Sequence, residues 1–337
     1  MSTPARILIA AFVLLAAALP IINANGFLLT VGTLVALNII GATSLHLVIR
    51  TGHVSLAHAG FMGIGGYTAT LTLMNLGWPF PLNILAGALS PALLALLIGP
   101  VLLRLQGKYF VLVTFLLGEI LRLIFVQWSS VTGGANGIFG VPPAAPIFAS
   151  PAGFYWLVLG TSLLCVALVA RVLSGETGRV IDSVREGERL AQCAGIPVLQ
   201  VKVAAFVLAT ALVGIQGGLT AHYLQYIDPG GFTSVQSLGF VVMNVIGGMR
   251  SLLGPIIGAA FMVTLPEFLR GYVEMQQVMF GIILIVVMAA FPGGLVDLAA
   301  RVRVLAGRYA DRVKPESAKL EGAKPEGASL PERIARP

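Results

Sequence analysis

Charged side chains inside apolar segments are the residues of this chain whose chemistry is most informative. Glu119 and Arg122 lie three positions apart in an apolar run, so a helix would place them on one face. Charges are costly in a hydrocarbon core and mark either functional sites or pairs that hold helices together. The two residues therefore predict a contact with a transported solute or, alternatively, a mutual ion pair near the external boundary.

A second polar stretch, Thr51–Gly66 (TGHVSLAHAGFMGIGG), lies where a lipid-facing helix would carry Leu and Val. Backbone outside a helix survives at membrane depth only against protein or water, and such segments often line a transport pathway. The histidines are five positions apart, which is no helical metal spacing, so hydrogen-bonded structural histidines are the alternative. We take as candidate pathway residues Ser55, His58, Gly63, Glu119, Arg122 and Asn136, with no metal site.

The sequence lacks the motifs of an enzyme. A P-loop requires Gly-x-x-x-x-Gly-Lys-Ser/Thr, but Gly107-Lys108 is followed by Tyr109 and has no Gly at the required earlier position. His-Glu-x-x-His and Gly-x-Ser-x-Gly are also missing from the sequence. Cys165 lies in an apolar run and Cys193 in a polar one, which favours neither a disulfide nor a zinc site. We predict no catalytic residues, no cofactor and no ATP hydrolysis by this chain itself.

Composition sets the class of the protein. The chain has 57% hydrophobic and 10% charged residues, against roughly 45–50% and about 25% in soluble domains. Its mean hydropathy is +0.92. The formal net charge of +7 comes from basic residues that follow the membrane topology and form no patch interleaved with aromatic residues. We therefore expect a polytopic membrane protein without a nucleic-acid partner.

Apolar runs close to the about 20 residues that cross a hydrocarbon core predict an all-α protein with about ten transmembrane segments. Some are expected to be discontinuous, because 234–249 would reach only about 24 Å as a helix in a core of about 30 Å. The predicted segments are Ile7–Ile22, Phe27–Ile49, Val54–Leu76, Leu82–Leu103, Tyr109–Trp128, Phe154–Leu173, Val201–Leu224, Ser234–Met249, Leu252–Leu269 and Gln276–Phe291.

The positive-inside rule gives the orientation. With the N- and C-termini in the cytoplasm, every basic residue except Arg122 and Arg270 falls on the cytoplasmic side. The uncharged, proline-rich loop 129–153 then lies outside the cell. A cleaved signal peptide at residues 1–25 is the alternative to a first span, and it leaves the later orientation unchanged.

One polar stretch, at about 175–200, interrupts the apolar segments. Its apolar residues recur at near-helical spacing, and Gly195 followed by Pro197 indicates a helix end. Three Arg and four acidic residues make it about neutral, whereas a helix for a lipid surface is normally rich in Lys and Arg. The stretch therefore predicts an amphipathic cytoplasmic helix that contacts a protein. Its apolar positions are Val180, Ile181, Val184, Ala191 and Ala194.

A family resemblance is carried by five runs: Thr51–Leu71, Leu105–Arg122, Thr132–Pro142, Gly178–Pro197 and Val245–Leu269. In this order, over roughly residues 27–295, they resemble the permease subunits of ABC importers for branched-chain amino acids, of the LivM type. The resemblance implies two ATP-binding cassette subunits, a second permease subunit and a periplasmic substrate-binding protein as partners. It also implies a multi-pass protein of the bacterial inner membrane, embedded in the lipid bilayer.

The resemblance further implies that the amphipathic stretch is a coupling helix seated in a cleft of an ATPase subunit. Gln192-Cys193 replaces an expected alanine and acid, which leaves individual contacts open, and a solvated helix face is the alternative reading. Urea, amides or aromatic acids are alternative substrates, and an ion-coupled secondary transporter is an alternative class. The implied docking residues are Arg185, Glu186, Glu188, Ala191 and Gly195.

Two domains are predicted from these patterns. Residues 1–295 form a transmembrane permease domain that contains the coupling helix. Residues 296–337 form a cytoplasmic tail, which becomes rich in Pro, Glu, Lys, Ala and Gly. Because such a composition buries little apolar surface, we expect disorder from about residue 314.

Overall fold

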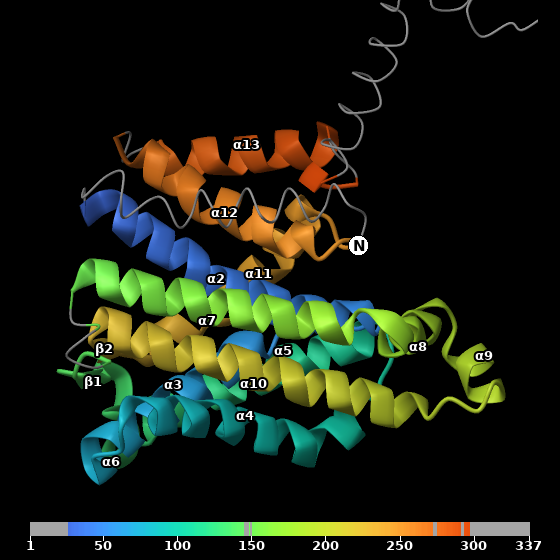
Figure 1. Cartoon of the computed structure of the whole chain (residues 1–337), viewed down its shortest axis with the longest axis horizontal. Coiled ribbons are helices and arrows are strands. Elements are labelled where there is room, and N and C mark those ends of the chain that lie inside the picture. Colours follow the sequence, from blue (N-terminus) through green and yellow to red (C-terminus); the bar gives the residue numbers. More distant parts are fainter. Residues whose placement is uncertain (1–25, 145–147, 149, 272–274, 291–292, 297–337) are drawn as a thin grey trace, which may run out of the picture. The chain divides into compact units, whose positions relative to one another are not determined.

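The computed structural model describes residues 26–144, 148, 150–271, 275–290 and 293–296 (Figure 1). The first predicted segment, Ile7–Ile22, and the predicted tail from 297 onward lie outside the described residues. The described residues belong to one compact unit that ends at Val296.

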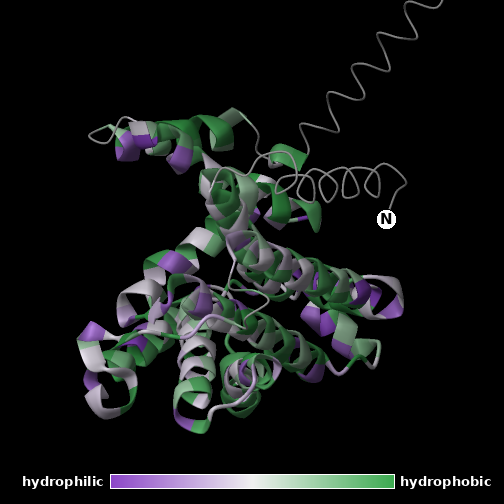
Figure 2. Cartoon of the chain, turned by 60° about the vertical axis from the view of Figure 1, so that its left-hand side comes forward, coloured by the Kyte–Doolittle hydropathy of each residue, from purple (hydrophilic) through white to green (hydrophobic). Residues whose placement is uncertain are grey.

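Each predicted span within the described residues coincides with a helix, to within about one helical turn at either end. These helices are α2 (Gly26–Arg50), α3 (His58–Leu76), α4 (Phe80–Leu102), α5 (Lys108–Gln127), α7 (Pro151–Val172), α10 (Val198–Leu224), α11 (Ser234–Gly247), α12 (Leu253–Phe268) and α13 (Gln276–Ala290). Hydrophobic residues dominate them (Figure 2).

Short elements connect the long helices. The β-structure of the described residues is one antiparallel pair, β1 (Ile138–Phe139) with β2 (Tyr226–Ile227), a small departure from the all-α prediction. The remaining elements are α6 (Ser129–Thr132), α8 (Gly175–Glu186), α9 (Glu188–Cys193), η1 (Gly134–Asn136), η3 (Pro229–Phe232) and η4 (Leu269–Gly271).

Within the residues that the structure describes, six helical segments are long and apolar enough to cross a membrane on their own, so the chain is a multi-pass membrane protein. They are α2, α4, α5, α7, α10 and α12 together with η4. α11 and α13 are apolar but shorter, and α3 contains the polar, glycine-rich sequence described above. The total of ten spans therefore stays a prediction.

The core forms where α10 packs against α3 and α4. Glycines make this approach possible: a Cβ on Gly214 would lie 2.3 Å from the carbonyl oxygen of Gly87, and one on Gly217 would lie 2.0 Å from that of Met62. Small residues at membrane helix interfaces let backbones approach this closely. These glycines serve helix packing.

The polar segment between α2 and α3 is not helical, so α3 begins at His58 instead of the predicted Val54. Gly52 reverses the chain after α2 with φ +88°, a region that favours glycine. Side chains from distant helices then satisfy the free backbone: the Leu56 N–H donates to Thr114 Oγ1 at 3.2 Å, and the Ala59 N–H donates to Ser237 Oγ at 2.9 Å. The segment can remain outside a helix because the surrounding protein supplies partners for its backbone groups.

Candidate functional site

A polar protrusion, defined here as α8 and α9, extends beyond one end of the helix bundle (Figure 1). The prediction of one continuous helix was wrong at one point, because α8 ends at Glu186 and Gly187 is extended with φ −172°. Glycine costs about 1 kcal/mol relative to alanine inside a helix. The break lets both helices pack around one small core of Val184, Ala191 and Val198.

The predicted end of this region is confirmed. α9 ends at Cys193, and Gly195 follows in the left-handed region with φ +81°. Pro197 then stands directly before α10. Glycine in the left-handed conformation just past a helix is a common way to end it.

Two of the predicted docking residues face the protein interior. The Glu188 carboxylate accepts a hydrogen bond from Lys202 Nζ and another, at 3.0 Å, from Gln106 Nε2. The Lys202 side chain is only 2% exposed, and Ala191 is buried in the core of the protrusion. Glu188 thus attaches α9 to α10 and to the loop after α4, while Ala191 packs inside the protrusion.

The outer surface of the protrusion carries the other predicted residues, since Arg185, Glu186 and Gly195 are exposed. Sequence reasoning missed Arg189 and Leu190, which share this surface. Leu190 is 78% exposed, far more than a leucine outside the membrane normally is. Its signal was present in the sequence as a leucine directly after Arg189, off the predicted apolar face.

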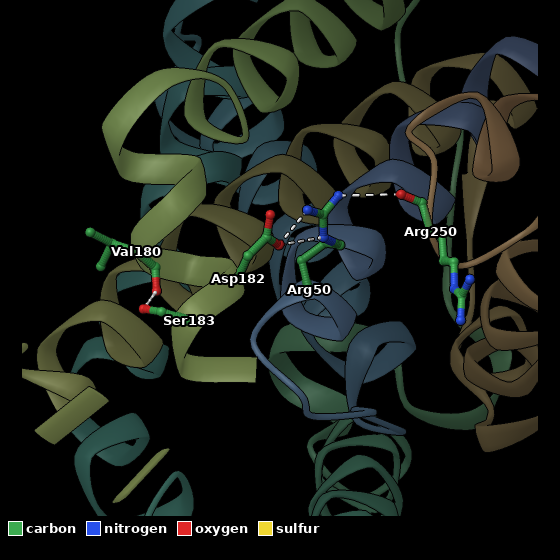
Figure 3. A network of polar contacts seen from close by, with 5 residues as sticks. All are labelled: Arg50, Val180, Asp182, Ser183 and Arg250. Carbon is green, nitrogen blue, oxygen red and sulfur yellow. Dashed lines mark hydrogen bonds and ion pairs between the residues drawn. The ribbon is translucent and has the colours of Figure 1, made fainter. Parts of the chain in front are cut away.

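A second anchor joins α8 to α2 (Figure 3). Arg50, the last residue of α2, donates from Nε and Nη2 to Asp182 Oδ1, the former at 3.1 Å. Its Nη1 also lies 3.5 Å from the carbonyl oxygen of Arg250, which follows α11. The guanidinium of Arg50 thus connects α2 to two other segments. From the sequence alone, Arg50 served only as one of the basic residues that indicate the orientation in the membrane.

An open hollow of about 370 Å³ lies beside the break between α8 and α9. His53 lines it, and its ring packs edge-on against Phe110 with centroids 4.7 Å apart. Burial, followed by the charge of Lys202, lowers the pKa of His53. The neutral imidazole therefore predominates near pH 7. The hollow adds polar surface to the base of the protrusion.

The charged pair of α5 is formed as one of the sequence alternatives predicted. Arg122 Nε donates to Glu119 Oε2 at 2.8 Å, and Ser234 Oγ, at the start of α11, donates to Glu119 Oε1 at 2.6 Å. The buried stripe of α5 is Phe110, Thr114, Gly118, Leu121 and Phe125. At 100° per residue, Glu119 lies away from this stripe, beside the exposed Leu112, whereas Arg122 lies at the edge of the stripe, next to Gly118.

The other candidate pathway residues lie elsewhere. Ser55 and His58 are fully buried, and His58 Nε2 is 3.1 Å from Ser44 Oγ of α2. Gly63 packs against the ring of Phe125. Asn136 is exposed in η1, where its carbonyl oxygen accepts from the Tyr226 hydroxyl at 3.0 Å. Only Glu119 and Arg122 are brought into direct contact with each other.

The sequence matches a family model over residues 27–289, described as "Branched-chain amino acid transport system / permease component". This chain belongs to that family. The permease is 27% identical over 320 residues to the "High-affinity branched-chain amino acid transport system permease protein LivM" of Escherichia coli (strain K12), covering 87% of this chain and 75% of the relative. Identity and coverage are the same for the LivM protein of Salmonella typhimurium.

A more distant relative of the permease is the "Probable branched-chain amino acid transport permease protein LivM" of Methanocaldococcus jannaschii. It is 23% identical over 210 residues, which cover 57% of this chain and 61% of the relative. No solved structure matches the permease. The family match spans both the protrusion and the charged pair of α5.

Proposed function

We propose that this chain is the non-catalytic transmembrane subunit of an ABC importer that moves branched-chain amino acids across the bacterial inner membrane. Separate ATPase subunits supply the energy. The observation that carries the proposal is the protrusion, an amphipathic pair of helices with a charged outer surface that is anchored to the membrane helices from within.

The outer surface of the protrusion suits a protein partner. Arg185, Glu186 and Arg189 offer exposed charges of both signs, and Leu190 adds an exposed apolar side chain. Interfaces commonly place an apolar anchor within a polar rim. An ATPase subunit that binds here would push on α8 and α9, and their anchors would pass the displacement to α2 and α10.

The charged face of α5 suits the transport pathway. α4 and α5 have the same fraction of buried residues, and the exposed large side chains of both are apolar. α5 differs in its charged pair, because the side chains of Glu119 and Arg122 are 26% and 30% exposed. A charged pair is far costlier against lipid than against water or protein. A second permease subunit, placed against α5, would enclose a pathway along this face, with a periplasmic binding protein delivering the substrate from outside.

Mutation of the docking surface tests the proposal. In a reconstituted assembly, Arg185→Ala combined with Glu186→Ala should remove most substrate-stimulated ATP hydrolysis while the permease stays folded. The matched control removes two charges outside the protrusion, Glu267→Ala with Arg270→Ala, and should leave stimulation unchanged. Unaltered stimulation in the docking variant, or failure of any ATPase subunit to co-purify with the tagged permease, would contradict the proposal.

Experiments can distinguish two alternatives to this function, a different substrate and a different class of transporter. The names printed for the relatives favour branched-chain amino acids, but related permeases for urea, amides or aromatic acids would share this scaffold. Binding assays on the partner binding protein distinguish them, because that protein makes most of the selection. Transport by the chain alone in liposomes, driven only by an ion gradient, would favour a secondary transporter instead.

A further inference from the structure

The contacts of α11 connect the protrusion to the charged pair of α5. The helix contains only 14 residues, and its two ends lie at the two polar features that the proposed function uses. At its start, Ser234 Oγ donates to Glu119 at 2.6 Å. Just beyond its end, the carbonyl oxygen of Arg250 lies 3.5 Å from the Arg50 guanidinium, which also holds Asp182 of the protrusion.

Between these ends, α11 is fixed to α2. Asn244 Nδ2 donates to the carbonyl oxygen of Ala42 at 2.9 Å, and Asn244 Oδ1 lies 3.0 Å from His46 Nδ1. Phe240 is fully buried, and its ring would be 2.5 Å from a Cβ on Gly41. Because interiors are close-packed and these contacts are buried, the two helices cannot slide past each other without breaking them.

Arg50 is the junction between this pair of helices and the protrusion. A guanidinium presents a rigid fork of donors, and here it contacts Asp182 on one side and the end of α11 on the other (Figure 3). Lysine has one point-like ammonium and cannot contact both groups in the same geometry. The guanidinium of Arg50 therefore fixes where these two partners lie, in addition to supplying a positive charge.

We propose that Arg50 is the positioning residue that couples the protrusion to the transport pathway. When the ATPase displaces α8, Asp182 moves Arg50, and α2 and α11 move with it as one unit. The far end of that unit displaces Ser234 from Glu119 and so changes the environment of the charged pair. This inference rests on the proposed function, in which the protrusion binds the ATPase and the face of α5 lines the pathway.

Arg50→Lys is the direct test in the complete reconstituted assembly, since it preserves the positive charge. We expect the ATPase subunits to remain bound and basal hydrolysis to persist, while substrate-stimulated hydrolysis falls about tenfold, within the usual range for coupling between sites. Asp182→Asn should have the same effect. Its side chain is 41% exposed, so this variant should fold even if Arg50→Lys does not. Glu176→Gln is the control, since this residue lies on the same helix in an exposed pair with Arg179.

A second measurement reports on the start of α11, next to Ser234. Val235→Cys places a thiol at a position that is 75% exposed, next to Ser234, in a Cys193→Ser background. In this parent, a nonhydrolysable ATP analogue should change the rate of thiol labelling, and Arg50→Lys and Asp182→Asn should abolish that change. A structural defect alone would alter the basal rate but not remove the response to nucleotide.

The outcomes separate the inference from the proposed function. If both variants retain stimulated hydrolysis and the nucleotide-dependent labelling, Arg50 does not couple the two regions and the inference is overturned. If no ATPase subunit binds the parent protein, the proposed function itself fails. If the variants lose stimulation and labelling response while still binding the ATPase, the inference stands.

Discussion

The ion pairs of the protrusion and those of the membrane helices differ in the distance they span along the chain. Two pairs of the protrusion join separate elements, Asp182 with Arg50 and Glu188 with Lys202, and a third, Glu176 with Arg179, lies within α8. Within α5, and at the end of α12, the pairs link residues three positions apart. A pair within one helix supports that helix, whereas a pair between elements fixes where one element sits on another.

In the proposed function, this difference lets the protrusion move together with the helix bundle. Glu188 and Asp182 lie on either side of the break at Gly187, and each is held by a cation from a different membrane helix. A force on either helix of the protrusion therefore reaches the bundle through its own anchor. The exposed pair of Glu176 and Arg179, 3.8 Å apart, has no such role.

Removal of the buried cation should have the largest effect on stability. Lys202→Met leaves the Glu188 carboxylate with only its contact to Gln106. We expect a loss of about 2 kcal/mol in unfolding free energy, below the roughly 3–5 kcal/mol seen for fully buried pairs, because Glu188 remains partly exposed. Denaturant titration of the purified permease in detergent measures this change.

The matched control for that variant is Lys108→Met. Lys108 is exposed and lies 5.5 Å from the centroid of the Tyr109 ring, so its replacement should alter the unfolding free energy by less than about 1 kcal/mol. Equal losses in the two variants would mean that the pair between α9 and α10 does not anchor the protrusion.

The pair on α5 should matter for transport more than for stability. Glu119→Gln keeps an acceptor for Ser234 but removes the negative charge beside Arg122. We expect the transport rate to fall about tenfold, which corresponds to the about 1.5 kcal/mol of a hydrogen bond to a charged group. Substrate uptake into proteoliposomes, with the melting temperature measured in parallel, would show the effect. A change in melting temperature without a change in uptake would assign the pair a structural role only.

The smallest effect is expected for the local pair at the end of α12. The Arg270 side chain is 71% exposed, and exposed pairs typically contribute about 0–1 kcal/mol. Glu267→Gln should therefore leave both stability and transport close to the parent values in the same assays. A loss as large as that of Glu119→Gln would remove the distinction between these two local pairs.

The sequence predicted those features that depend on neighbouring residues. Apolar runs placed the membrane helices, and the three-residue spacing of Glu119 and Arg122 predicted their ion pair. Gly195 predicted the end of α9. Each follows from helix geometry or local conformational preference, which a single stretch of chain determines.

The features that it missed depend on residues far apart in the sequence. The periodicity of apolar residues continues from Val184 to Ala191, so the apolar pattern predicted one helix across Gly187, although glycine disfavours helix at this position. Glu188 was expected to face a partner, yet Lys202 and Gln106 turn it inward. Arg50 and Asp182 are separated by 132 positions, and only tertiary packing brings them together.

The side of the membrane on which the protrusion lies is the most direct test of the account. Cys193 is exposed on α9, whereas Cys165 is buried in α7, so an impermeant thiol reagent should report on the protrusion without any mutation. The account predicts that Cys193 is labelled in inside-out membrane vesicles and remains unlabelled in intact cells. Labelling of Cys193 in intact cells would place the protrusion outside and contradict ATP-driven coupling through it.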